Sequence, residues 1–155
     1  MGDEVDTAWA LYHSFTEDQR GVAVIHELAS PGIFAGPGDD DYTIPEADLG
    51  LSVADMSAAQ QALLLSIIET FVLDGQETHA ALRMAQIEEG LSELHFAWMG
   101  PGDEGAEIYY RIYGPTVLIE LDHVNGNDHI HSVYRDPSND YGEGMLAEHY
   151  ARYPH

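Results

Sequence analysis

The chain has 155 residues and no cysteine, and 28 acidic against 5 basic residues give a formal net charge of −23 at pH 7. The absence of thiols excludes disulfides, cysteine nucleophiles and thiolate-bound metals, so any metal needs His and carboxylate ligands. The negative charge excludes nucleic acid and anionic membrane as partners, because both would be repelled. The length and an apolar fraction of 45% predict one globular domain over residues 1–155.

The acidic residues are dispersed along the chain, which is typical of a soluble, salt-tolerant surface; a lysine-poor genome is the alternative explanation. The longest apolar run, at 62–68, is too short to cross a bilayer, and the first residues lack the pattern of a secretory signal. We therefore expect a cytoplasmic protein.

Residues 1–92 have the pattern of helices. A short helix is expected over 5–13, and a capping box at Thr16 and Gln19 begins a second whose apolar spacing continues to Leu28. Glycine and proline predict a loop over 31–51. Ser57 or Asp55 caps the clearest helix, which ends near residue 74, and another covers 76–89.

The hydrophobic period changes from 3.6 to 2 at about residue 93, and strands are expected at 94–99, 107–113, 116–123 and 128–135. Short turns connect them, so residues 93–136 form an antiparallel β-meander, and a C-terminal helix follows at 144–152. The sequence predicts an α+β fold, with N-terminal helices packed on this meander.

Alternation along these strands separates an apolar face from a polar one. A two-residue turn at Gly114-Pro115 would place Tyr109 opposite Glu120 and Arg111 opposite Leu118. A two-residue turn at Asn125-Gly126 would place Asp122 opposite His129, and Glu120 opposite His131.

Two imidazoles at positions i and i+2 of one strand point the same way and can share an ion. His129, His131 and Glu120 are therefore the candidate ligands of one divalent transition metal, with His95 as the fourth. A ligand set rich in nitrogen and without sulfur suits Cu, Fe, Mn, Ni or Zn. Asp122 is a candidate to ligate the ion or to orient a histidine. The alternative is two exposed histidines on an edge strand, beside ordinary ion pairs.

The candidate catalytic residues are Arg111, Tyr109 and Asp122, with Arg111 positioning a small anionic substrate. This predicts a metalloenzyme that acts on a small molecule, with oxidative chemistry ahead of zinc-type hydrolysis. Two alternatives stay open: a non-catalytic metal-binding or ligand-binding accessory module, and a purely structural polar face. A homo-oligomer or a partner subunit is compatible with each.

The residues of this face lie in stretches that resemble the C-terminal half of the DUF3500 family, whose function is unknown. The stretches are Leu94–Trp98, Tyr109–Ile112 with Gly114–Thr116, Leu118–Glu120 with Asp122, His129–Val133, Arg135–Pro137, Asp140–Gly142 and Leu146–Tyr150. Because the function of the family is unknown, the resemblance does not indicate which reaction the protein catalyses. It implies that the candidate site residues and Arg135 belong to family motifs. Family members usually carry a further N-terminal region, so part of the site could come from a second subunit.

Overall fold

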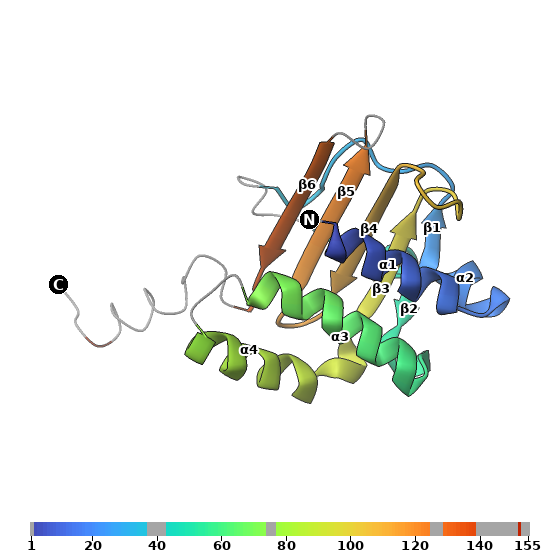
Figure 1. Ribbon diagram of the computed structural model, residues 1–155. Coiled ribbons are helices and arrows are strands. Elements are labelled where there is room, and N and C mark those ends of the chain that lie inside the picture. The colour runs from blue at the N-terminus through green and yellow to red at the C-terminus, as the bar shows by residue number, and fades with distance from the viewer. Residues whose placement is uncertain (1, 37–42, 74–76, 125–128, 139–151, 153–155) are drawn as a thin grey trace.

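A computed structural model describes residues 2–36, 43–73, 77–124, 129–138 and 152. The described helices are α1 (Asp3–Ser14), α2 (Glu17–Ala23), α3 (Ala58–Val72) and α4 (Glu77–Glu89), with 3-10 turns at Glu46–Asp48, Val53–Asp55 and Leu91–Glu93. The described strands are β1 (Val24–His26), β2 (Leu51–Ser52), β3 (His95–Met99), β4 (Ile108–Tyr113), β5 (Leu118–Val124) and β6 (His129–Arg135). Helices α1 and α3 lie side by side on one face of the sheet, and the chain between β1 and β2 crosses the other face (Figure 1). The predicted α+β fold is confirmed.

The starts of α2 and α3 are as expected. The Thr16 hydroxyl accepts a hydrogen bond from the Gln19 N–H at 3.2 Å, and the Gln19 side chain accepts one from the Thr16 N–H at 3.0 Å. Ser57, rather than Asp55, forms the same reciprocal box with Gln60 at the start of α3. These bonds satisfy backbone donors that a helix start leaves unpaired.

The second helix is shorter than predicted. It ends at Ala23, and Val24–His26 forms β1, which pairs with β3 in parallel. The helical spacing was misleading because Val22 and Leu28 are exposed, at 54% and 70%. The β-branched Val24 and Ile25 suit a strand beside β3. Strand β2, which also pairs with β3, begins at Leu51, the last residue of the segment predicted as a loop.

The meander has the order β3-β4-β5-β6 with antiparallel pairing, but both predicted registers are wrong by two residues. The corrected pairs are Tyr109–Asp122, Arg111–Glu120, Glu120–Val133, Asp122–His131 and Val124–His129. In the first hairpin Gly114 pairs with Val117, so Pro115 is the second residue of the turn and not the third. Proline favours this position because its fixed φ suits it and its missing N–H is not needed there. Moving a turn by one residue moves partners by two, so every side chain keeps its predicted face. The second turn and the predicted C-terminal helix lie outside the described residues.

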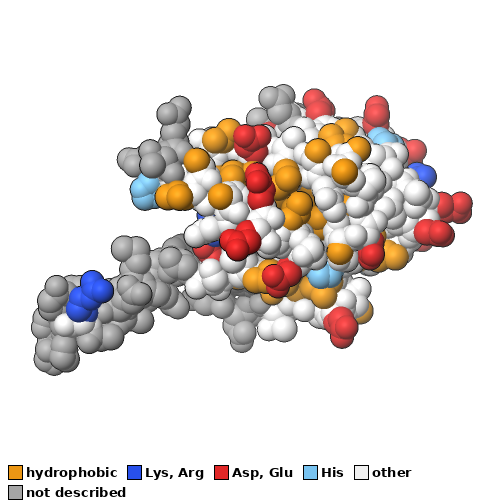
Figure 2. Space-filling model, turned by 90° about the horizontal axis from the view of Figure 1, so that it is seen from below, with side chains coloured by type: hydrophobic (Ala, Val, Ile, Leu, Met, Phe, Trp, Pro, Cys, Tyr) orange, Lys and Arg blue, Asp and Glu red, His pale blue; other side chains and the backbone are white. Residues whose placement is uncertain are grey.

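Acidic side chains are dispersed over the face of the molecule that Figure 2 shows, with apolar side chains between them. Within the described part of the chain, no helix is both long and apolar enough to cross a membrane.

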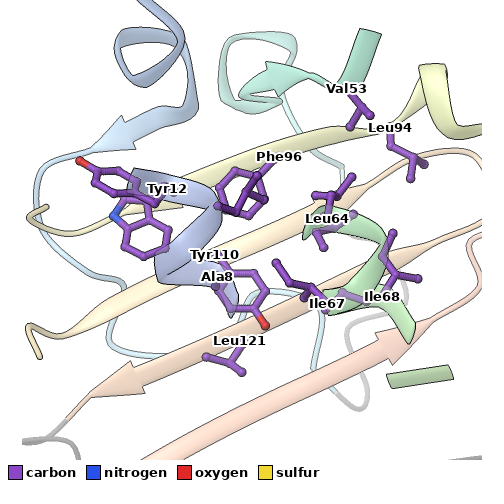
Figure 3. Packing of buried hydrophobic residues seen from close by; sticks show 14 of the residues in the cluster. Ala8, Tyr12, Val53, Leu64, Ile67, Ile68, Leu94, Phe96, Tyr110 and Leu121 are labelled. Carbon is purple, nitrogen blue, oxygen red and sulfur yellow. The ribbon is translucent and has the colours of Figure 1, made fainter. Parts of the chain in front are cut away.

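The hydrophobic core lies between the sheet and the α1–α3 pair (Figure 3). Ala8, Leu64 and Ile67 from the helices are fully buried against Tyr110 and Leu121 of the sheet. The Tyr12 ring stacks on Trp98 with centroids 4.6 Å apart. This packing occupies one face of the sheet and leaves the polar side chains on the other.

Candidate functional site

The second face of the sheet carries a buried polar strip. Its members are Tyr109, Arg111, Glu120 and Asp122, which are at most 4% exposed. The sequence predicts that they share a face, but not that they are covered. The cover is the described part of the chain between β1 and β2, which is hydrogen-bonded to the strip through Phe34, Ala35 and Asp48 and passes close to it at Gly32.

Glu120 fastens this cover to the sheet. Its Oε2 accepts hydrogen bonds from the Phe34 N–H at 2.9 Å and from the Ala35 N–H at 2.8 Å. Its Oε1 accepts a third from the Tyr109 hydroxyl at 2.6 Å. Both oxygens of this predicted metal ligand are therefore engaged within the protein.

Tyr109 acts as a neutral hydrogen-bond donor. Burial, and then the negative charge of Glu120, raise the pKa of Tyr109, while the nearby Arg111 opposes the shift. The Phe34 ring meets the Tyr109 ring edge-on, with centroids 5.3 Å apart. The hydroxyl therefore keeps its proton and holds Glu120 in place.

Arg111 lies directly opposite Glu120 in the register, so two opposite charges are neighbours on this face. One terminal N–H of its guanidinium donates to the Asp48 carbonyl. Its Nε is buried and has no hydrogen-bond partner within the described residues. A buried donor without a partner is costly and marks a place for an acceptor.

Asp122 and His131 form a second polar unit. The buried Asp122 carboxylate accepts from the His131 backbone N–H at 3.0 Å, and its Oδ1 lies 2.9 Å from Nδ1 of the same residue. An ionised carboxylate only accepts, so this contact requires the hydrogen on Nδ1 and leaves Nε2 as the basic nitrogen. The His131 side chain is 46% exposed, and the His129 ring lies beside it at 4.6 Å between centroids.

His95 shares the predicted face but lies at its other end. It pairs with Tyr113, three strands and four residues away from His131, which is roughly 20 Å at standard sheet spacings. The four predicted ligands therefore do not converge. No three or more His, Asp or Glu among the described residues are grouped to hold a metal ion. His129, His131 and Asp122 are the part of the predicted site that the structure brings together.

Sequence reasoning missed the part played by the covering segment. Arg135 is buried, and its guanidinium donates to the Ala35 carbonyl at 3.3 Å. Gly32 passes so close to the strip that a Cβ there would lie 3.8 Å from Asp122 Oδ2. The available signal was the set of four charged residues predicted on one face of the sheet, Arg111, Glu120, Asp122 and Arg135, because buried charges require partners from elsewhere in the chain.

The comparisons with known proteins give one match. A family model described as "Protein of unknown function (DUF3500)" matches residues 1–143. No curated protein and no solved structure matches the chain. Because the family model covers nearly the whole sequence, including every residue of the polar strip, the chain belongs to the DUF3500 family.

Proposed function

We propose that the protein binds a divalent transition metal through Nε2 of His129 and His131, and that this ion carries out its chemistry on a small molecule. The observation that carries the proposal is the 2.9 Å contact between Asp122 Oδ1 and His131 Nδ1. A carboxylate that holds one ring nitrogen directs the other toward a metal and raises its basicity.

The arrangement favours these two histidines over the four-ligand set. His129 and His131 occupy alternate positions of β6 with neighbouring rings, so both imidazoles can reach one ion. Two protein nitrogens leave several coordination positions for water or substrate. Imidazole ligands of this kind bind divalent ions in the order Cu above Ni and Zn, and Mn below them.

The type of reaction would depend on which metal ion is bound. Copper or iron supports oxidative chemistry, which we keep as the leading form of the proposal, and zinc supports hydrolysis through a metal-bound hydroxide. The exposed position of the two rings also suits an accessory module that binds a metal without catalysis. The proposal includes a cytoplasmic setting and a small-molecule substrate, as expected from the sequence.

Isothermal titration of untagged, metal-free protein with Cu²⁺ and with Zn²⁺ tests the proposal. His129→Ala and His131→Ala should each abolish the binding, and Asp122→Asn should weaken it about 10–100-fold through loss of orientation. His95→Ala is the matched control, because His95 is a strand histidine on the same face but distant from the pair. Equal binding by wild type and the His129→Ala/His131→Ala double variant would rule the site out.

A further inference from the structure

A cavity lies between the sheet and its cover, on the β3–β4 side of the polar strip. It has a volume of about 320 Å³ and is lined mainly by apolar side chains, among them Ile25, Phe34, Ile44 and Met99. Thr43, Asp48, Arg111 and Glu120 line its polar part. A mostly apolar pocket with a few converging polar groups is typical of a small-molecule site, and this volume is at the small end of the range.

Glu120 and Arg111 differ in how many of their hydrogen-bonding atoms already have partners in the protein. Glu120 already accepts three hydrogen bonds from the protein, so it has little need of a ligand. Arg111 is 4% exposed, and its Nε–H has no hydrogen-bond partner among the described residues. Arg111 therefore brings to the wall of the cavity a buried guanidinium, one N–H of which lacks an acceptor.

We propose that this cavity binds a small carboxylic acid with an apolar body, and that the Arg111 Nε–H donates to its carboxylate. A carboxylate is favoured over a neutral carbonyl because a charge-assisted bond to guanidinium is about twice as strong as a neutral one. The apolar body would pack against Ile44, Phe34 and Met99.

This site is distinct from the histidine pair. The cavity is not lined by Asp122, His129 or His131. The cover separates it from these residues: Phe34 and Ala35 bind Glu120, and Gly32 passes close to Asp122. Acid binding therefore neither requires nor follows from metal binding, and each can fail without the other.

The test is an NMR titration of the metal-free chain, because the Nε–H of an arginine gives its own ¹H–¹⁵N signal. Benzoate and hexanoate are the probes, and benzamide and hexanamide are their neutral counterparts. We expect both acids to shift the Arg111 Nε–H signal together with the amides of Phe34 and Ala35, with at least tenfold tighter binding than the neutral probes.

Two lining variants report on the cavity without removing the buried charge. Ile44→Phe should fill the space and weaken benzoate binding at least tenfold, while the volume-conserving Ile44→Leu should keep the affinity within about twofold. A dispersed amide spectrum establishes that each variant is folded. The proposal is overturned if millimolar benzoate and hexanoate leave the Arg111 signal in place, if the amides bind as tightly as the acids, or if Ile44→Phe binds like wild type.

Discussion

Glu120 joins the sheet to its cover through two hydrogen bonds from backbone N–H groups. A carboxylate that receives two backbone N–H groups and one hydroxyl can be buried at 1% exposure, because its charge is met by donors and by Arg111 opposite. The same bonds explain why Glu120 is a structural anchor rather than an open metal ligand.

Replacing this carboxylate should be costly. Glu120→Ala leaves the Phe34 and Ala35 N–H groups and the Tyr109 hydroxyl buried without their acceptor and removes the negative charge next to Arg111, which should lower the free energy of unfolding by about 3–5 kcal/mol. Urea denaturation followed by circular dichroism measures the change. The exposed Glu27→Ala should cost less than about 0.5 kcal/mol, and equal losses in the two variants would contradict the anchoring role.

Tyr110 gives a prediction about alkaline pH. Burial and the charge of Glu4 raise the pKa of this tyrosine above its ordinary value of 10.0, and its hydroxyl has no hydrogen-bond partner among the described residues. A raised pKa in the folded state contributes stability that is complete below pH 10 and is lost as pH rises beyond it, because only the unfolded state ionises. Tyr110→Phe removes this dependence. Relative to wild type, the variant should gain about 1.4 kcal/mol of unfolding free energy between pH 8 and pH 11, measured by urea denaturation at each pH. A constant difference would contradict this account.

At the scale of elements, a sequence predicts which face of the sheet a strand residue occupies better than it predicts which residue lies opposite. The alternation of Tyr109, Arg111 and their neighbours depends only on the two-residue period of a strand, so the polar face could be predicted. The partners depend on which residue begins the turn, and a shift of one residue at Gly114-Pro115 changes every pair. The path of a loop depends on distant contacts, and nothing in residues 30–35 themselves indicates that two of their N–H groups bind Glu120.

Gly50 controls the approach of the cover to β3. Its φ is +83°, and a Cβ there would lie 2.3 Å from the Phe96 carbonyl oxygen. Gly105 has a similar φ of +81° but no atom within 4 Å of such a Cβ, so it is a matched control. Gly105→Ala should cost about 1–2 kcal/mol for the backbone conformation alone, and Gly50→Ala clearly more, as measured by thermal and urea unfolding. Equal costs would show that the close approach is unimportant.

The described part of the molecule is built on a sheet whose two faces differ. Helices α1 and α3 cover one with a hydrophobic core, while the chain between β1 and β2 covers the other through hydrogen bonds to buried charges. The packing of helices on one face of the sheet could be predicted, because the hydrophobic periodicity of the sequence indicates both the helices and the apolar face. The separation of the polar residues into two places could not be predicted, because it depends on the path of the cover. The cover leaves Arg111 beside a cavity and His131 partly exposed.

The net charge of −23 gives a prediction for the molecule as a whole. Repulsion between dispersed acidic groups destabilises the compact state and is screened by salt, so the unfolding free energy should rise between low and molar KCl. Urea denaturation across a KCl series measures it. A variant with Glu27, Glu88 and Asp103, all exposed, changed to amides should show a smaller rise. A flat or falling profile in the wild type would contradict this explanation of the acidic surface.

We propose that the Asp122 carboxylate holds His131 by Nδ1 and so leaves Nε2 free to bind a metal. Long-range ¹H–¹⁵N NMR of the histidine rings, recorded with and without Zn²⁺, tests it most directly. We expect the neutral His131 ring to carry its hydrogen on Nδ1, and the Nε2 signals of His129 and His131 to shift together on addition of Zn²⁺ while His95 is unchanged. A hydrogen on Nε2 of His131, or Nε2 signals that ignore Zn²⁺, would contradict the account.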